Sequence, residues 1–307
     1  MRSGFLIIDK APGVRSTQCV NMAKRILGGE ARVGHAGTLD AGAFGVLVLL
    51  IGRATRTSRF VMMLPKTYLA TARLGMRTDT DDLFGEVIST GNIGEVDEEG
   101  VDRALFSLYG HRDQIPPAFS AVKVKGKRAH SMARKGYDVR LAARPVLITS
   151  LRRTGPIMGG RDVPLMINCH QGTYVRSIVR DLGECLGCGA TVLSLQRESL
   201  GPFFAADALS SDDMALMEST SLEERILPLS FLSNSFTSYR VSSGEEEALA
   251  SGCPLRVGEL TRSSWGRYRT GEYVMIFAKK IVSFARIESE GGACMARPVT
   301  NLTLEGP

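Results

Sequence analysis

Residues 34–51 read GHAGTLDAGAFGVLVLLI, a glycine-rich segment that runs into the longest apolar run of the chain. Closely spaced glycines let a backbone turn tightly or approach a ligand. Between Gly34 and Ile51 the only ionisable side chains are His35 and Asp40. A carboxylate just before a buried strand is unfavourable unless another group pairs with it. The stretch therefore predicts a core strand over 46–51, preceded by a tight loop whose aspartate either caps the local backbone or performs chemistry.

Regular elements are predicted on both sides of this loop. Alternating or continuous apolar residues favour strands, and apolar positions three and four residues apart after a capping residue favour helices. Strands are expected over Phe5–Asp9, Tyr68–Leu74 and Val163–Cys169. Helices are expected from Ser16 or Thr17 to Leu27, over Val101–Leu108, and from a cap at Thr173 to Leu186. Strands and helices do not alternate regularly, which argues against a doubly wound parallel sheet.

The composition changes around residues 227–238, where Pro228 and a Ser/Asn-rich stretch indicate a linker. Short predicted strands follow over Leu255–Val257, Tyr273–Ala278 and Ile281–Ile287. The expected fold class is therefore α+β. A mixed-sheet domain is predicted over residues 1–231, and a small β-rich domain over residues 232–307.

Composition excludes several classes of protein. The chain has 307 residues, of which 44% are hydrophobic and 23% charged, so it is neither disordered nor collagenous. The apolar run over 44–51 is far shorter than the roughly 20 residues that cross a bilayer. No cleavage site follows the N-terminus, so we expect a cytoplasmic protein. Six cysteines form no disulfide framework, and Cys185-x-x-Cys188 has no second pair of ligands, so we expect no metal.

Positive charge is concentrated in one segment. The net charge is +6, yet residues 123–144 contain eight basic residues against a single aspartate, Asp138. The basic residues are Lys123, Lys125, Lys127, Arg128, Arg134, Lys135, Arg140 and Arg144. Acidic runs lie elsewhere, at 97–99 and 245–247. This segment is called the basic segment below; it predicts either a polyanion site or a solvated surface loop.

Several short motifs occur in a fixed order along the first 200 residues. They are Asp9–Gly13 with Ser16, the loop around Asp40, Lys66–Tyr68, Thr78–Asp81 with Gly75 and Gly85, Gln114–Lys123, Gly172–Ser177 and Leu195–Arg197. Together they resemble the TruB family, the tRNA pseudouridine-55 synthases. The sequence departs from the family pattern at Ala11, Arg15, Ala41 and His130, and Ala41 puts the rigidity of the catalytic loop in doubt.

The resemblance implies roles for individual residues. Asp40 matches the catalytic aspartate, Tyr68 the tyrosine that packs on the target base, and Arg176 the arginine that pairs with the aspartate. His35 matches a histidine that contacts the RNA loop. Substrate-binding roles are further implied for Tyr174 and Leu195 in the pocket, and expected for Lys10, Lys123, Lys125 and Arg128.

The family's reaction isomerises uridine 55 in the T-loop of tRNA to pseudouridine. It breaks the C1′–N1 bond and forms C1′–C5 without net oxidation, so no cofactor is expected, and the glycine spacing forms no nucleotide-binding motif. A base within folded RNA must flip out to reach a buried carboxylate. That carboxylate can attack C1′, add to the base or act as a base in a glycal route. The expected partner is the tRNA T-arm, with no membrane and no protein partner, and a monomer is expected.

Other interpretations stay open. Tyr68 alone would be read as an ordinary strand aromatic, and Arg176 alone as a surface arginine. A non-catalytic RNA-binding or RNA-folding factor would also use the basic segment, although it has no need of Asp40, Tyr68 and Arg176 together. A synthase acting on a different RNA is a further alternative. Residues 252–255, Gly-Cys-Pro-Leu, resemble a PUA-type RNA-binding domain, whereas a small module that serves stability alone would read similarly.

Overall fold

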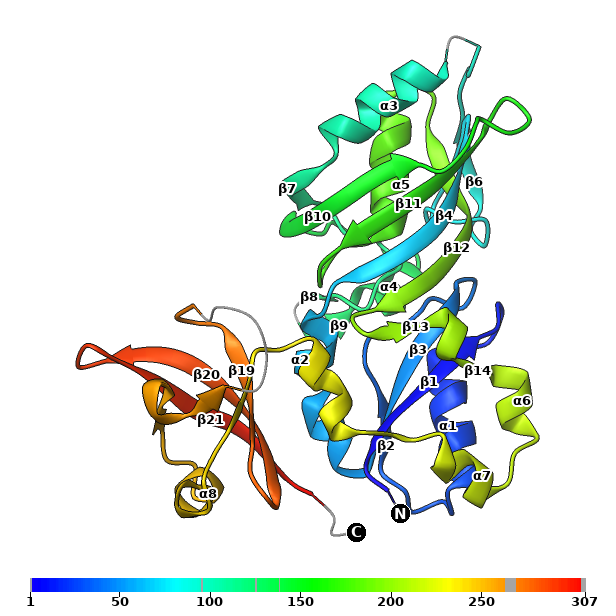
Figure 1. The fold of residues 1–307 in the computed structure, drawn as a ribbon. Helices are drawn as coiled ribbons and strands as arrows, with labels where there is room; N and C mark the ends of the chain where they lie inside the picture. The colour runs from blue at the N-terminus through cyan, green and yellow to red at the C-terminus, as the bar shows by residue number, and fades with distance from the viewer. Residues whose placement is uncertain (1, 95, 125, 138, 263–268, 305–307) are drawn as a thin grey trace.

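The computed structural model describes residues 2–94, 96–124, 126–137, 139–262 and 269–304. Its main feature is an eleven-stranded sheet in the order β14-β1-β3-β12-β4-β11-β10-β7, with β13 beside β12, β15 beside β1 and β2 beside β3 (Figure 1). These strands are β1 (Gly4–Lys10), β2 (Val33–His35), β3 (Phe44–Ile51), β4 (Lys66–Leu74), β7 (Gly110–Gln114), β10 (Arg144–Arg153), β11 (Asp162–Cys169), β12 (Ala190–Leu200), β13 (Phe203–Phe204), β14 (Leu209–Ser210) and β15 (Leu227–Pro228). The sheet mixes parallel and antiparallel pairs, which confirms the predicted fold class.

Helices cover this sheet. α3 and α5 pack behind β4, β10 and β12, and α1, α6 and α7 lie together beside β1 in the other half of the sheet (Figure 1). The α-helices are α1 (Ser16–Ile26), α2 (Ser58–Met63), α3 (Glu98–Ser107), α4 (Ala129–Ala133), α5 (Val175–Cys185), α6 (Ser211–Ala215), α7 (Ser219–Glu224) and α8 (Ser243–Ala250). The 3₁₀ helices are η1 (Gly52–Thr57), η2 (Ala205–Asp207), η3 (Leu229–Asn234) and η4 (Val257–Glu259). No helix in the described ranges is long and apolar enough to cross a membrane.

A second sheet of six strands follows in the order β17-β21-β20-β19-β16-β18. Its strands are β16 (Ser238–Arg240), β17 (Leu255–Arg256), β18 (Thr261–Arg262), β19 (Tyr273–Phe277), β20 (Ile281–Glu290) and β21 (Ala293–Thr303). The predicted C-terminal β-rich region is thus confirmed. Two small hairpins complete the fold: β5 (Met76–Thr78) with β6 (Val87–Thr90), and β8 (Lys123–Val124) with β9 (Lys127–Arg128).

The expected linker is packed. Within residues 227–238, β15 pairs with β1, and Leu229 and Leu232 of η3 are buried in one hydrophobic cluster. The same cluster contains Phe60 of α2 and Phe284 of β20, whose rings stack with centroids 4.1 Å apart. The prediction of a linker was wrong because polar Ser/Asn composition hid two leucines that point into a shared core. This core joins the two sheets.

The large sheet has a narrow seam. β3 and β12 pair in parallel over only two positions, Gln196 with Phe44 and Arg197 with Gly45. Gly45 has φ +94°, and a Cβ placed on it would lie 2.4 Å from the Arg197 carbonyl oxygen. Only glycine fits this backbone conformation and this approach. The two halves of the sheet, seen as the upper and lower parts of Figure 1, meet at this seam.

Substituting Gly45→Ala is expected to destabilise the protein by about 2–4 kcal/mol, because it adds a steric overlap to an unfavourable φ. Gly110→Ala is the matched control, since Gly110 has φ +91° with open space around it. Its expected loss is about 1 kcal/mol. Urea unfolding followed by circular dichroism measures both. Equal losses at the two positions would show that the seam tolerates the extra methyl group.

Candidate active site

The loop that carries Asp40 is held from several sides. Ser16 Oγ donates to the Leu39 carbonyl and accepts from the Leu39 amide, both at 3.0 Å. The carbonyl of Ala41 accepts from the Gly13 amide at 2.8 Å and from Lys10 Nζ at 3.3 Å. These contacts hold the loop in place although alanine follows the aspartate. Ser16 was expected to be a possible helix cap, whereas the Gln18 side chain accepts the Arg15 amide at the start of α1.

Arg176 lies at the centre of the site. It belongs to the first turn of α5, and its side chain is only 5% exposed. Its Nε contacts Asp40 Oδ2 at 2.9 Å, and its Nη1 lies 3.7 Å from Asp82 Oδ2. The carbonyls of Thr80 and Phe119 accept from its two terminal nitrogens at 2.8 and 3.1 Å. A guanidinium fixed by four groups presents the Asp40 carboxylate, itself 46% exposed, in one orientation.

The start of α5 is fixed from outside the helix. Gln114 donates to the Tyr174 carbonyl at 3.1 Å and accepts from the Tyr174 amide at 2.8 Å. Tyr174 is the N-cap residue and makes no side-chain cap hydrogen bond, so the expected cap at Thr173 was wrong by one residue. Tyr174 is partly buried, and burial raises the pKa of its hydroxyl, with Asp40 and Arg176 among the neighbouring charges.

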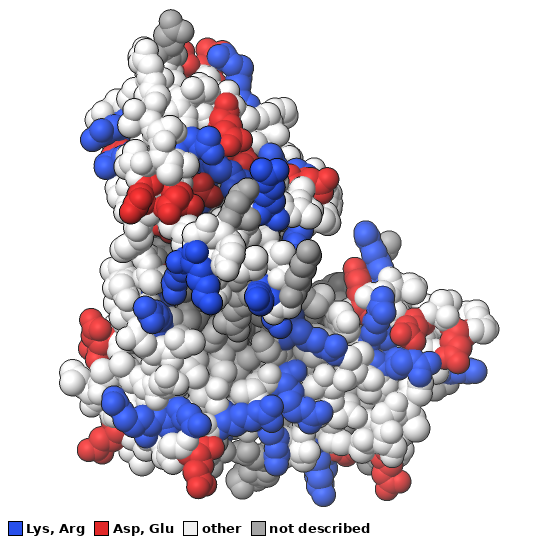
Figure 2. All heavy atoms as spheres, turned by 180° about the vertical axis from the view of Figure 1, so that it is seen from behind, with Lys and Arg blue, Asp and Glu red and all other residues white. Residues whose placement is uncertain are grey.

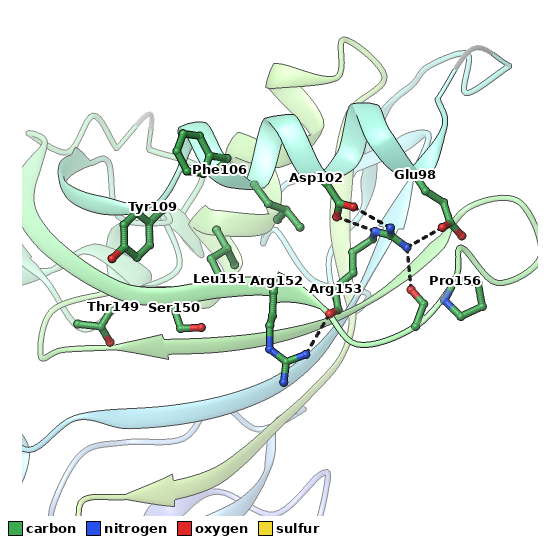
Figure 3. A pocket seen from close by; sticks show the side chains of 12 residues that line it. Glu98, Asp102, Phe106, Tyr109, Thr149, Ser150, Leu151, Arg152, Arg153 and Pro156 are labelled. Atoms are coloured by element: carbon green, nitrogen blue, oxygen red, sulfur yellow. Dashed lines mark hydrogen bonds and ion pairs between the residues drawn. The ribbon is translucent and has the colours of Figure 1, made fainter.

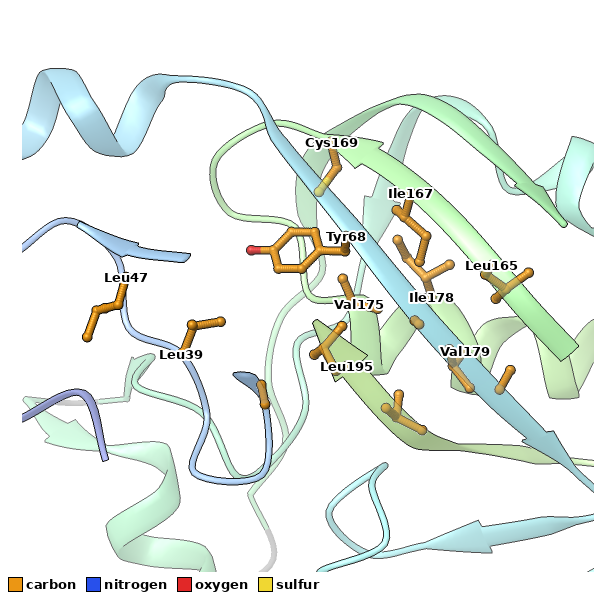
Figure 4. Packing of buried hydrophobic residues seen from close by; sticks show 14 of the residues in the cluster. Leu39, Leu47, Tyr68, Leu165, Ile167, Cys169, Val175, Ile178, Val179 and Leu195 are labelled. Atoms are coloured by element: carbon orange, nitrogen blue, oxygen red, sulfur yellow. The ribbon is translucent and has the colours of Figure 1, made fainter. Parts of the chain in front are cut away.

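Tyr68 completes the group. It projects from β4 toward the segment that carries Leu39, with Val175 and Leu195 beside its ring (Figure 4). Burial raises the pKa of its hydroxyl, so Tyr68 is a neutral phenol at pH 7. Arg197 is the largest influence that lowers this pKa, whereas Asp40 raises it. The structure thus brings Asp40, Tyr68 and Arg176 to one place, together with the predicted pocket residues Tyr174 and Leu195.

A buried cation, Arg197, lies beside Tyr68 on the neighbouring strand. Arg197 is 1% exposed, and its Nε and Nη2 donate to the carbonyls of Val46 and Gly37 at 2.6 and 3.2 Å. Desolvation, together with the nearby Arg197, lowers the pKa of His35, so its imidazole is neutral at pH 7. The buried Nδ1 of His35 has no hydrogen-bond partner among the described residues. A neutral ring beside the pocket suits stacking or hydrogen bonding to a nucleotide.

Lys10 was expected to bind the substrate, and its position in the structure differs from that expectation. It has no exposed surface, and its ammonium donates to the carbonyls of Ala11, Val14 and Ala41. This placement argues against a direct contact between Lys10 and a substrate. The quoted motif over Asp9–Gly13 indicated a functional residue, but the long-range contact of Lys10 with Ala41 could not be predicted from the sequence. Lys10 supports the loop of Asp40.

The burial of Lys66 makes the free energy of unfolding of the protein depend on pH. It is 8% exposed, its Nζ donates to the carbonyls of Met62 and Leu64, and burial lowers its pKa from 10.5 to about 8. Above pH 8 the unfolded chain therefore binds more protons at this lysine than the folded chain, and stability rises with pH. Relative to Lys66→Met, we expect the wild type to gain about 1.4 kcal/mol between pH 7 and pH 9.

Urea unfolding at the two pH values measures this difference. Lys24→Met, which removes an exposed lysine of α1, is the matched control. A difference between wild type and Lys66→Met that stays constant from pH 7 to pH 9 would contradict the effect of burial on Lys66.

The basic segment lies next to the site. It begins shortly after Phe119, whose carbonyl holds Arg176, and forms the β8–β9 hairpin and α4. Lys123 is exposed, as are Lys127 and Arg134. Lys125 lies outside the described residues, and Arg128 is placed in β9. Lys and Arg side chains gather over the middle and lower part of the face seen in Figure 2.

Another hollow lies away from this group, between α3 and β10 (Figure 3). Phe106, Tyr109 and Leu151 line it, and it contains none of the predicted site residues. Its Arg153 is neutralised by Asp102 at 2.8 Å and Glu98 at 3.1 Å. Arg152, the other arginine of the hollow, contacts the Arg153 carbonyl and Met166 Sδ. The hollow therefore lies apart from the group of residues around Asp40. Among the described residues no group of three or more metal-ligating side chains occurs.

The sequence did not reveal the contact of Asp82 with Arg176 or the structural role of Arg197. Asp82 directly follows the quoted Thr-Asp motif, and its spacing from Asp40 gave no sign that both contact Arg176. Arg197 stood inside a quoted motif without a role. The sequence held no signal for this role, because the partners of Arg197 are backbone carbonyls, which no residue pattern specifies.

The chain is similar to known proteins over most of its length. A family model described as TruB family pseudouridylate synthase (N terminal domain) matches residues 24–175. A second, described as tRNA pseudouridylate synthase B C-terminal domain, matches residues 176–232. A Ruegeria pomeroyi protein named tRNA pseudouridine synthase B is 43% identical over 232 residues, 74% of each chain. A Roseobacter denitrificans protein of the same name is 38% identical over 285 residues, covering 88% of this chain and 93% of the relative.

Solved structures share the fold. The crystal structure of a Cbf5-Nop10-Gar1 complex superposes with a TM-score of 0.73 at 23% identity, over 97% of this chain and 84% of the other. An H/ACA RNP bound to a substrate RNA containing 2′-deoxyuridine gives a TM-score of 0.71 at 22% identity, over 98% and 85% of the two chains. At these identities the likeness concerns the fold.

Proposed function

Because the chain belongs to the TruB family of pseudouridylate synthases, we propose that it isomerises uridine 55 in the T-loop of tRNA to pseudouridine. The chain is a tRNA pseudouridine synthase, as its relatives are named. The observation that carries the proposal is the buried Arg176, which holds the half-exposed Asp40 at 2.9 Å beside Tyr68.

Asp40 is proposed as the catalytic carboxylate. In the reaction the C1′–N1 bond breaks, the base turns, C1′ joins C5, and the proton on C5 leaves while N1 gains one. A carboxylate stabilises positive charge developing at C1′, or bonds covalently to the sugar or base. Arg176 is proposed to keep this carboxylate charged and aimed. Tyr68, neutral at pH 7, offers a flat face to the uracil and a hydroxyl that can donate a proton.

The remaining predicted residues take supporting roles in the proposal. Tyr174 and Leu195 line the pocket, and His35 contacts the RNA loop around the flipped base. All groups of the site come from one chain, so the proposed enzyme acts as a monomer. Its six cysteines are free thiols, which suits a reducing cytoplasm. Residues 1–231 are proposed as the catalytic domain and residues 232–307 as a PUA-like RNA-binding domain.

The proposal is tested by incubating the purified protein with an unmodified tRNA transcript, without added cofactor, and mapping pseudouridine at single-nucleotide resolution. Product at uridine 55 alone supports the proposal. Product at another uridine, or in ribosomal RNA only, would transfer the activity to a different substrate. Tight binding without product would favour a non-catalytic RNA-binding factor.

The basic segment, including Lys123, Lys125 and Arg128, is proposed to contact RNA phosphates. Lys127→Ala is expected to weaken binding of tRNA and to reduce the slope of log K against log salt by about 1, because each phosphate contact releases counterions. Arg103→Ala is the control, since Arg103 is exposed on α3 and paired with Glu99. Filter binding between 50 and 300 mM KCl measures both slopes. An unchanged slope for Lys127→Ala would remove this residue from the RNA interface.

A further inference from the structure

An exposed phenylalanine lies beside the loop of Asp40. Phe84 forms the turn of the β5–β6 hairpin and is 75% exposed. A Cβ placed on Gly42 would lie 1.9 Å from Phe84 Cε2, so one edge of the ring rests on the backbone two residues after Asp40. The rest of the ring faces outward. The exposed part of this aromatic ring therefore lies next to the loop that carries Asp40.

The turn that carries Phe84 is fixed to the catalytic group. Asp82 Oδ1 accepts from the Phe84 amide at 3.0 Å and from the Thr80 hydroxyl at 2.7 Å, and the Asp82 carbonyl accepts from Thr78 at 2.6 Å. The other carboxylate oxygen of Asp82 faces Arg176 at 3.7 Å. One side chain thus contacts both the phenylalanine turn and the arginine that holds Asp40. Because the backbone of this turn is fixed, less conformational freedom is lost when the Phe84 ring binds a partner.

The surroundings of Phe84 favour a neutral, flat partner. Asp79 and Glu86 are exposed on the same hairpin, and Leu83 beside Phe84 is 40% exposed. Phosphates would be repelled by these carboxylates, whereas the face of a nucleobase carries no charge. Bases of unpaired RNA stack on aromatic side chains irrespective of their identity.

We propose that Phe84 is a stacking platform for the base immediately next to the flipped uridine. Flipping removes a stacking neighbour from that base, and the phenylalanine ring replaces it. This assignment rests on the proposed function, since it requires an RNA whose target base enters the cleft of Asp40. It makes Phe84 a positioning residue that acts through the substrate.

The test is a double-mutant cycle between protein and RNA. Wild-type protein and Phe84→Ala are compared on a stem-loop RNA containing the target uridine. Further copies of this RNA carry an abasic nucleotide on the 5′ or on the 3′ side of the target. Affinity is measured in the Asp40→Asn background, and single-turnover pseudouridine formation in the active background. Phe84→Ala is expected to weaken binding about 10-fold on the intact RNA. At one of the two neighbouring positions, the abasic nucleotide is expected to weaken binding by the wild type by a similar factor. The same nucleotide is expected to leave the affinity of the Phe84→Ala variant unchanged.

Further variants separate stacking from general apolar contact. Phe84→Trp is expected to bind as wild type and Phe84→Leu to lose most of the affinity that Phe84→Ala loses. The salt slope of Phe84→Ala is expected to equal that of the wild type, because no phosphate contact is lost. Phe106→Ala, which removes a phenylalanine 80% exposed on α3, is the matched control and is expected to bind as wild type.

Two results would overturn the assignment: wild-type affinity for Phe84→Ala, or losses that add independently at both neighbouring positions. These results are distinct from failure of the proposed function, in which the wild type forms no pseudouridine in the intact RNA. The binding cycle in the Asp40→Asn background is informative in either case.

Discussion

Asp40→Asn is expected to lower the rate of pseudouridine formation at least about 10⁴-fold while tRNA binding persists. The amide has nearly the shape of the carboxylate but neither its charge nor its nucleophilicity. The surface proposed to bind tRNA, which includes the exposed Lys123 and Lys127, is left in place by the substitution. Single-turnover assays with radiolabelled tRNA measure the rate, and filter binding measures the affinity.

Stability separates a catalytic Asp40 from a structural one. The carboxylate is 46% exposed, and Arg176 keeps Asp82 and the Thr80 and Phe119 carbonyls as partners when Asp40 is neutralised. The expected loss is therefore at most about 1–3 kcal/mol. Asp113→Asn, at an exposed position of β7, is the control and is expected to retain activity. Substantial activity in Asp40→Asn, or a protein that fails to fold, would contradict the proposed role.

Arg176→Lys is expected to lower the same rate by about 10²–10³-fold, with smaller effects on tRNA affinity. Lysine preserves the positive charge but not the planar fork, so it cannot contact Asp40, Asp82 and the two carbonyls together. The carboxylate of Asp40 then loses its fixed orientation. Single-turnover rates measured with saturating protein isolate this effect from binding.

The matched control for Arg176→Lys lies one turn further along α5. Arg180 contacts Asp81 at 3.1 Å and Asp181 at 3.0 Å, so Arg180→Lys disturbs a comparable ion pair away from Asp40. It is expected to change stability more than catalysis. If both variants reduced the rate equally, the effect would belong to the helix and not to the arginine beside Asp40.

Local sequence patterns predicted the elements around the site well. The strand predicted over 46–51 is part of β3. A short continuous run of apolar residues after glycines favours a buried strand. The helix predicted from Ser16 or Thr17 to Leu27 is α1, and the strand over 68–74 is part of β4. The residues quoted for the family resemblance also placed Asp40 and Arg176 together, and the structure has them 2.9 Å apart.

Contacts between residues that are far apart in the sequence could not be predicted from it. Ser16 was interpreted by its position before a helix, whereas its hydroxyl holds Leu39, 23 residues away. Lys10 was expected to bind the substrate, yet its ammonium donates to the backbone carbonyls of Ala11, Val14 and Ala41. Phe84 had no place in any periodic pattern. In each case the partner is a backbone group or a glycine brought close by the fold, which leaves no complementary residue type to recognise.

The two-position seam between β3 and β12 has a consequence for the order of events during synthesis. Arg197 and Val46, joined across it at 2.6 Å, are 151 residues apart in sequence. Contacts between such distant segments form slowly and late, since a long loop must close first. On the ribosome the loop of Asp40 is complete long before β12 emerges. The nascent chain therefore stays without a finished pocket until nearly two thirds of it has been made, and it acquires RNA-modifying capacity in one late step.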